Sequence, residues 1–184
     1  ASPHHLKMNA TSKLVMRHAS TTLEASSNLL QVNTPNLITA RYGAAETELL
    51  RLDGYEDTPG NSTQAFVDGK TQIGCQTNGT NDWLGYIAEA IVYSNDISDA
   101  EINKVETYLA VKYGLTIDNS AGTTAGDYTS TIGATLWDAD DEPSYHNNII
   151  GIGRDDIEAL LQKQSHTMDD TTRIYLNTLV ATNS

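Results

Sequence analysis

The stretch IAEAIVYSNDISDAEINKVETYLAVKYGLTI, residues 87–117, decides the fold of the middle of the chain. Ser98 and Glu101 form the S-x-x-E pattern of a capping box, in which each side chain satisfies a free backbone N–H of the other residue. Apolar side chains then recur at helical spacing, and Gly114 suits a left-handed cap at the end. The stretch therefore predicts a helix at about residues 99–113.

The segment YIAEAIVY, residues 86–93, precedes this helix. Its side chains are apolar on both faces, which is typical of a strand that is covered on both sides. Glu89 is the exception, and a carboxylate in such a strand needs a partner. We therefore expect a doubly covered strand with a polar or cationic group facing Glu89.

Other short stretches also have strand character and are separated by turn-rich pieces. The predicted strands are residues 12–18, 36–42, 47–54, two strands within 64–76 around Asp68-Gly69, and 172–181. Asp-Gly between apolar runs is a strong hairpin signal. Short strands at this spacing indicate an all-β sandwich. After Ile117 the composition becomes small and polar, so residues 118–184 are predicted to form a second, β-rich unit.

The formal net charge of the 184-residue chain is −13. This charge would be repelled by a phosphate backbone and by an anionic membrane surface, so we expect no nucleic-acid binding. Cations and neutral ligands such as glycans remain plausible. No run of 18 apolar residues is present, so we expect no membrane insertion. Cys75 is the only cysteine, which excludes an intramolecular disulfide and suggests a buried thiol.

The densest acidic cluster contains Asp138, Asp140 and Asp141. Calcium takes six to eight oxygen ligands from flexible loops, and closely spaced carboxylates supply them. The cluster lacks the glycine and the distant glutamate of an EF-hand loop. A calcium site and a solvated acidic loop therefore both stay open. Arg154, which lies among acidic residues, is expected to form an internal ion pair that orders its loop, with ligand binding as the alternative.

Three aromatic residues lie in turn regions and are candidate ligand-binding residues: Trp83, Tyr55 and Trp137. An exposed aromatic ring can stack on a sugar, although a turn tryptophan can equally close the edge of a core. The sequence contains no G-x-S-x-G elbow and no H-E-x-x-H pattern, and no catalytic carboxylate pair can be picked out. It therefore predicts a protein that is not an enzyme.

Residues 83–115 resemble the C-terminal end of laminin-G-like, concanavalin A-like jelly-roll modules of large secreted bacterial surface proteins. The matching residues are Ile87, Ala88, Glu89, Tyr93, Ser94, Glu101, Tyr108, Leu109, Ala110, Lys112, Tyr113 and Gly114. The resemblance implies an antiparallel jelly-roll sandwich at residues 1–117 with one short C-terminal helix. Residues 1–85 supply too few strands for a complete module of this class, so its first strands are expected to be missing.

Residues 145–165 are similar to a domain of poorly known function that often follows such modules. The matching residues are Tyr145, Asn147, Asn148, Ile149, Gly151, Ile152, Gly153, Arg154, Asp155, Asp156, Leu161, Gln162, Lys163, Gln164 and Ser165. This similarity implies a second small β-rich module at residues 118–184. We expect that module to be incomplete at its C-terminal end.

Together the two resemblances imply a secreted, non-catalytic adhesion module of the cell surface that binds a glycan or a surface protein. One alternative is a structural subunit of an extracellular fibre or homo-oligomer, with sheets completed by strands from a partner chain. A second alternative is an accessory module of a polysaccharide-degrading enzyme. Fold-level resemblance does not decide between these functions.

Overall fold

The chain forms several small antiparallel sheets around one helix. The structure, a computed structural model, describes residues 5–18, 21–24, 29–30, 33–42, 48–57, 73–74, 83–117, 126–141, 145, 149–156, 160–167 and 171–176. The strands are β1 (His5–Met8), β2 (Leu14–His18), β3 (Thr21–Glu24), β4 (Ile38–Arg41), β5 (Leu49–Leu52), β6 (Tyr55–Asp57), β7 (Tyr128–Thr129), β8 (Thr135–Trp137), β9 (Gly153–Asp155), β10 (Leu160–Gln162), β11 (Gln164–His166) and β12 (Arg173–Tyr175). The helix α1 spans Asp99–Tyr113. In the described part of the chain, no helix has the length and apolar character needed to cross a bilayer.

Two three-stranded sheets lie in the N-terminal half, in the orders β1-β2-β3 and β4-β5-β6. They share an apolar core of buried residues, namely Leu14, Met16, Leu30, Leu50 and Leu52, with Ile38, Ala40 and Tyr42 packed against it. Every residue of β5 is buried, including the charged Arg51. The middle strand of the second sheet is therefore covered on both faces, and its arginine must find its partners inside the protein.

The β5–β6 hairpin turns on two residues, Asp53 and Gly54. Their φ angles are 53° and 79°, and Leu52 pairs with Tyr55 across the turn. Two central residues with positive φ are the mark of a type I′ hairpin turn, which favours Asp-Gly. The sequence predicts a strand that ends here but no hairpin. The hairpin that it did predict, at Asp68-Gly69, lies outside the described residues.

The helix begins and ends as the sequence predicts. Ser98 Oγ accepts a hydrogen bond from the Glu101 backbone N–H at 3.3 Å, and Glu101 Oε2 accepts one from the Ser98 N–H at 2.7 Å. Gly114 follows Tyr113 with a φ of 67°. The predicted capping box and left-handed cap are thus confirmed.

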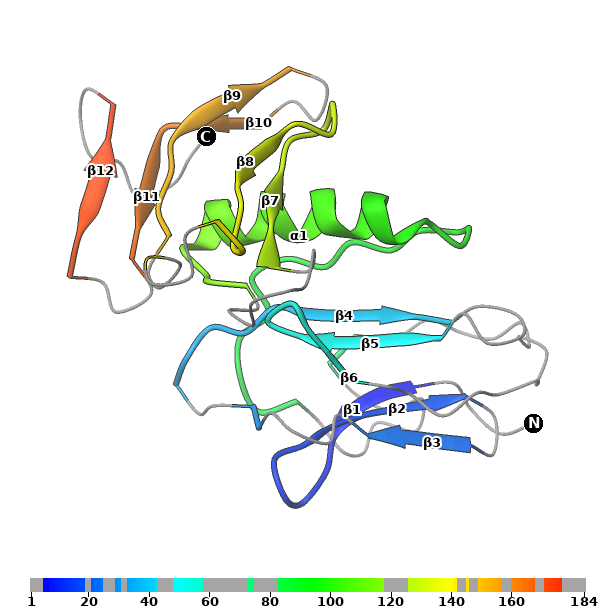
Figure 1. The fold of residues 1–184 in the computed structure, drawn as a ribbon. Coiled ribbons are helices and arrows are strands. Elements are labelled where there is room, and N and C mark those ends of the chain that lie inside the picture. The colour runs from blue at the N-terminus through cyan, green and yellow to red at the C-terminus, as the bar shows by residue number, and fades with distance from the viewer. Residues whose placement is uncertain are drawn as a thin grey trace.

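Figure 1 shows α1 between the β4-β5-β6 sheet on one side and the hairpins of the C-terminal half on the other. A second apolar core joins the helix to both sides; its buried members are Leu37, Ala110, Leu115, Ile117 and Tyr128. Gln162 Nε2 donates to the Val111 carbonyl at 3.2 Å, and Ser165 Oγ donates to the same carbonyl at 3.2 Å. These two side chains supply hydrogen bonds to a carbonyl group in the last turn of the helix, which has no partner within the helix. They thereby attach the C-terminal hairpins to α1.

A mostly β fold with one helix matches the expected fold class. No sandwich or jelly roll is resolved among the described residues. The strands predicted near residues 12–18, 36–42, 47–54 and 172–181 correspond to β2, β4, β5 and β12. The strand predicted at residues 86–93 is wrong, because these residues carry no strand in the structure. The strands predicted within 64–76, and Cys75, lie outside the described residues. The boundary at residue 117 stays a prediction.

Candidate binding surface along the helix

Residues 84–93, called the open segment below, leave a row of apolar side chains in solvent. The relative exposure of Leu84, Tyr86 and Val92 is 97%, 102% and 72%. That of Ile87, Ile91 and Tyr93 is lower, at 48%, 42% and 50%. Exposure therefore alternates with the period of an extended chain. The side chains at the odd-numbered positions are partly covered, and those at the even-numbered positions are more exposed.

The backbone hydrogen bonding of residues 86–93 is a second feature of the open segment. Among the residues that the structure describes, none exchanges a backbone hydrogen bond with this stretch. Toward the rest of the described chain, this backbone has N–H and C=O groups without a hydrogen-bond partner, together with exposed apolar side chains. This combination is the physical signature of an unpaired strand edge, which readily pairs with another strand.

Glu89 fixes the open segment to the end of α1. Its Oε2 accepts hydrogen bonds from Lys112 Nζ at 2.8 Å and from the Tyr113 hydroxyl at 2.9 Å. Lys112 Nζ also lies 5.0 Å from the ring centroid of Tyr108. Burial raises the pKa of Glu89, but the hydrogen bonds from Lys112 and Tyr113 outweigh it and the net shift is downward. The partner that the sequence required for this carboxylate is thus present, and Glu89 is anionic at neutral pH.

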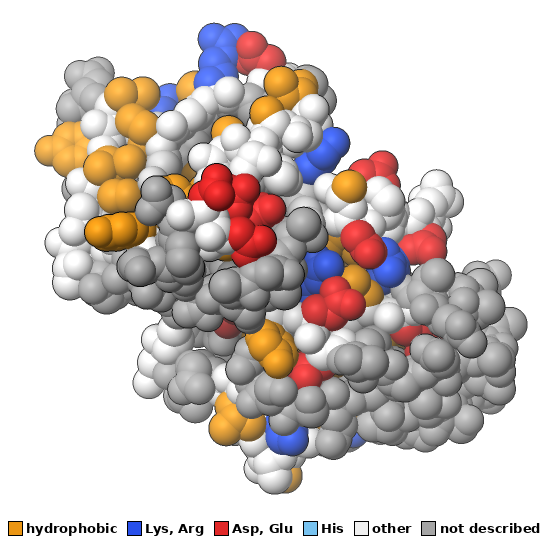
Figure 2. Space-filling model, in the orientation of Figure 1, with side chains coloured by type: hydrophobic (Ala, Val, Ile, Leu, Met, Phe, Trp, Pro, Cys, Tyr) orange, Lys and Arg blue, Asp and Glu red, His pale blue; other side chains and the backbone are white. Residues whose placement is uncertain are grey.

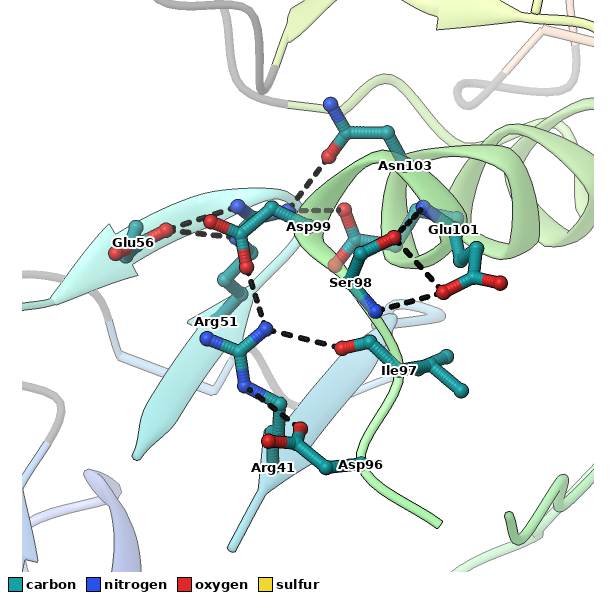
Figure 3. Close-up of polar contacts among 10 residues, drawn as sticks. Arg41, Arg51, Glu56, Asp96, Ile97, Ser98, Asp99, Glu101 and Asn103 are labelled. Atoms are coloured by element: carbon teal, nitrogen blue, oxygen red, sulfur yellow. Dashed lines mark hydrogen bonds and ion pairs between the residues drawn. The ribbon is translucent and has the colours of Figure 1, made fainter. Parts of the chain in front are cut away.

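Arg41 of β4 fixes the chain beyond the open segment. Its Nη1 donates to the Ile97 carbonyl at 3.1 Å and to Asp99 Oδ1 at 2.5 Å, and its Nε lies 3.4 Å from Asp96 Oδ1 (Figure 3). One guanidinium therefore binds the last residues before the helix and the first helical residue together. The open segment is held at Glu89 and again just past its C-terminal end.

A second arginine, Arg51, forms a buried ion pair between β5 and α1. Arg51 Nη1 donates to Glu106 Oε2 at 3.0 Å and to Asn103 Oδ1 at 2.8 Å, while Arg51 Nη2 lies 2.9 Å from Glu56 Oε2 (Figure 3). Burial raises the pKa of Glu106, and Arg51 opposes that shift. The pair joins α1 to β5 in the interior of the protein.

The three predicted aromatic ligand residues lie on different elements. Trp83 is exposed just before the open segment, and its backbone N–H donates to the Gly74 carbonyl at 2.6 Å. Tyr55 is half-buried in β6, opposite Leu52. Trp137 of β8 packs against the second core, which is the structural alternative for a turn tryptophan. Of the three, Trp83 lies nearest in sequence to the open segment.

The predicted calcium residues follow β8. Asp138 Oδ1 accepts hydrogen bonds from the N–H groups of Asp140 and Asp141, at 3.0 and 3.3 Å. Asp127, which the sequence reading missed, accepts from the Ala139 N–H at 3.0 Å, and its pKa is raised by burial and then by the three neighbouring carboxylates. Among the described residues, no group of three or more His, Cys, Asp or Glu side chains is placed to hold a metal ion. Calcium binding therefore stays a prediction.

Figure 2 shows acidic side chains gathered in groups on one face of the molecule, one of them beside basic side chains.

The expected internal ion pair of Arg154 is confirmed, with its Nε 2.5 Å from Asp156 Oδ1. The roles of Arg41, Arg51 and Lys112 were not predicted. An acidic residue in an apolar strand signals that a partner exists, as Glu89 does, but the sequence gives no indication of which cation supplies it.

Residues 101–184 match the family model of a domain of unknown function (DUF8202). The matched region begins in the first turn of α1 and includes every C-terminal strand from β7 to β12. It thus contains both the helix and the side chains that close its C-terminal end. No curated protein and no solved structure matches the chain.

Proposed function

We propose that the chain is a non-catalytic binding module of a secreted bacterial surface protein, and that it pairs through its open segment with an extended stretch of another protein. The observation that carries this proposal is the backbone of residues 86–93, which exchanges no hydrogen bond with the other residues that the structure describes. It is held in place at Glu89 and, beyond its end, by Arg41. Extended chain with free backbone groups is recognised by addition of a strand.

The energetics favour a strand as the ligand. Each pairing residue of an incoming strand supplies backbone groups for the open segment, and its side chains cover the even-numbered row. Burying one large apolar side chain stabilises the complex by about 1.5 to 3 kcal/mol relative to leaving that side chain in water. Leu84, Tyr86 and Val92 therefore offer enough apolar surface to make a weak but specific contact. Because the anchors already fix the chain, little ordering cost remains on this side of the contact.

The resemblance to laminin-G-like modules supports the same proposal. In a jelly roll, residues 86–93 would be a strand with neighbours, and a partner strand beside them would complete that arrangement. The extracellular location rests on this resemblance. A glycan ligand at Trp83, Tyr55 or Trp137 is a further proposal, but the three rings lie on separate elements and the open segment is the better supported site.

The same observation favours a second candidate function, a structural subunit of an extracellular fibre. In that case the strand that covers the open segment belongs to the next subunit of the assembly. Light scattering coupled to size exclusion separates the two functions, because a binding module stays monomeric at concentrations where a fibre subunit grows into large particles.

Amide hydrogen exchange tests the proposed strand pairing. The probe is a capped peptide of alternating valine and threonine, and the control is the same peptide with N-methylated backbone amides, which cannot pair. We expect the first peptide alone to slow exchange at alternate amides of residues 86–93. Tyr86→Asp should abolish the effect, whereas Leu136→Asp, at another exposed apolar position in β8, should retain it. Unchanged exchange with the pairing peptide would exclude the proposal.

A further inference from the structure

The two apolar cores divide the molecule on one side of α1. We infer that α1 and the C-terminal hairpins form one unit, that β1–β6 form another, and that the two units part reversibly at the contacts of α1 with β4 and β5. Each unit keeps its own core when they part. The boundary then lies before α1 rather than at residue 117, and this inference does not depend on the function proposed above.

Each core belongs almost entirely to one unit. Every member of the first core lies within residues 14–52, in or beside the N-terminal sheets. Of the ten described members of the second core, nine lie between Leu109 and Ile149, and only Leu37 comes from the N-terminal half. Parting the units therefore removes one member from the second core and none from the first. A unit with a core of its own stays folded when its neighbour moves away.

Hydrogen bonds also attach α1 and the residues after it to the C-terminal unit. Thr107 Oγ1, in the middle of the helix, accepts a hydrogen bond from the Thr129 N–H of β7 at 2.9 Å. The Tyr128 hydroxyl donates to the Leu115 carbonyl at 3.0 Å and accepts from the Ile117 N–H at 3.1 Å. The family match supports the same assignment, because it includes α1 from its first turn together with β7–β12.

Two ion pairs join α1 to the N-terminal sheets. Arg51 of β5 binds Glu106, and Arg41 of β4 binds Asp99 (Figure 3). An ion pair is a weak source of net stability, because each charge regains its hydration when the pair separates, whereas an apolar core regains nothing in water. The contacts of α1 with β4 and β5 are therefore the place where the molecule opens at the lowest cost.

The open segment moves with the helix when the units part. Glu89 is bonded to Lys112 and Tyr113 at the end of α1, whereas Arg41 holds the Ile97 carbonyl from the side of the N-terminal sheets. Opening breaks the contact with Arg41 and keeps the contacts of Glu89. The segment therefore loses the restraint beyond its C-terminal end but stays attached at its middle.

The helix offers two matched positions that face different units. Ile102 lies three residues after Asp99 and four before Glu106, on the same helix face, so it is directed toward the N-terminal sheets. Thr107 is directed toward β7, as its hydrogen bond with Thr129 shows. Their exposed fractions are nearly equal, at 3% and 4%. A reagent therefore reaches either side chain only when the structure opens on that side.

Thiol labelling of the full chain tests the inference. Ile102→Cys and Thr107→Cys are made separately, each together with Cys75→Ser so that a single thiol is present. With a small aromatic disulfide as the reagent and no denaturant, we expect Ile102→Cys to react about tenfold faster or more than Thr107→Cys. Equal rates would overturn the inference, and faster reaction of Thr107→Cys would overturn it by assigning α1 to the N-terminal sheets.

Arg51→Met locates the opening. Its loss leaves Glu106 without a cation in the closed state, so the open state gains and the thiol of Ile102→Cys should react about tenfold faster again. The rate of Thr107→Cys should not change, and Arg154→Met, in an exposed ion pair, should change neither rate. Equal acceleration of both thiols by Arg51→Met would show that the chain opens as a whole and would overturn the inference.

Hydrogen exchange on the unsubstituted chain repeats the comparison without cysteines. At low urea concentrations, the amides of α1 should share the urea dependence of β7 and β11 and differ from those of β4 and β5. Grouping of α1 with β4 and β5, or a single urea dependence for all elements, would overturn the inference.

Discussion

The guanidinium of Arg51 in β5 and the carboxylate of Glu106 in α1 form a buried ion pair, with 3.0 Å between Nη1 and Oε2. Only 5% of the arginine side chain and 1% of the glutamate side chain are exposed. The two residues are 55 positions apart in the chain, so the pair connects the N-terminal sheet to a helix that is distant in sequence. Each side chain is tolerable in the interior only because the other is present.

Arg51→Met should therefore be strongly destabilising. The substitution leaves the Glu106 carboxylate buried without its cation, which costs about 3 to 5 kcal/mol of the free energy of unfolding. The double variant Arg51→Met with Glu106→Leu removes both charges and should recover most of that loss. Urea unfolding followed by circular dichroism measures both.

Arg154→Met provides the matched control. Arg154 and Asp156 also form an ion pair, but their side chains are 70% and 74% exposed. An exposed pair of this kind contributes between 0 and about 1 kcal/mol. Equal losses for Arg51→Met and Arg154→Met would mean that burial of the Arg51–Glu106 pair has no energetic consequence.

Gly114 combines two constraints at the end of α1. Its φ is 67°, and a Cβ at this position would overlap the backbone carbonyl of His166 in β11. Gly114→Ala should therefore cost more than the roughly 1 to 2 kcal/mol of a left-handed alanine alone. Gly133→Ala tests that baseline, because Gly133 has a φ of 82° and an added Cβ would meet no atom within 4 Å. Thermal unfolding should rank the two variants in this order, and equal losses would show that β11 does not press against the helix end.

Asp53 lowers the stability of the folded state as pH rises, which is the reverse of the usual effect of an aspartate. Burial raises the pKa of Asp53 to about 6, although its Oδ1 accepts a hydrogen bond from the Leu37 N–H at 2.6 Å. The folded state therefore holds the proton more tightly than the unfolded state, where the pKa is about 3.9. The contribution of Asp53 to stability is highest below the unfolded value, falls as pH rises through this interval, and stays low above pH 6.

Asp53→Asn should remove this dependence. Asparagine keeps an oxygen for the Leu37 N–H and is favoured in a type I′ turn, yet it carries no charge. We expect the variant to be more stable than the parent by about 1 to 3 kcal/mol at pH 7 and equal to it near pH 3.5. Asp156→Asn, at an exposed position, should show no such crossover. Parallel pH profiles for Asp53→Asn and the parent would contradict the buried state of this carboxylate.

The helix was predictable because its determinants are local. The capping box, the apolar spacing and the terminal glycine all lie within residues 98–114, and each acts on backbone only a few positions away. The Asp53-Gly54 turn was predictable on the same basis, since the rule applied to Asp68-Gly69 also fits it. Local backbone chemistry thus accounts for α1 and for the β5–β6 hairpin.

The strand prediction for the open segment was wrong because an apolar pattern indicates that side chains favour burial. It does not identify the residues that bury them. The apolar residues on both faces of 86–93 indicate that both faces are stabilised by burial, but they do not specify which chain supplies the covering groups. The ligands of Arg41 and Arg51 were unpredictable for a related reason. Arg41 reaches Asp99 across 58 positions, and only the packing of α1 on the sheet brings them together.

The acidic loop after β8 offers a test of the calcium prediction. Asp138, Asp140 and Asp141 raise the pKa of Asp127 after the effect of burial, so these four carboxylates repel one another. A bound cation would relieve that repulsion. Extracellular calcium modules bind with dissociation constants of about 0.1 to 1 mM, so about 10 mM calcium should add roughly 1 to 3 kcal/mol to the free energy of unfolding. Asp140→Asn with Asp141→Asn should abolish the gain, and a gain that persists in this variant would place the ion elsewhere.

Lys112 controls how firmly the open segment is held. Lys112→Met leaves Glu89 with the Tyr113 hydroxyl but without its cation, so the segment should detach from the helix end more often. Chymotrypsin should then cleave after Tyr86 and Tyr93 several-fold faster, because proteolysis of a folded chain follows the population of locally opened states. Lys104→Met, which removes a lysine from the same helix without touching Glu89, should cleave at the parental rate. Equal cleavage of parent and Lys112→Met would mean that the contacts of Glu89 do not restrain the segment, and pairing with a partner strand would then have to supply the ordering itself.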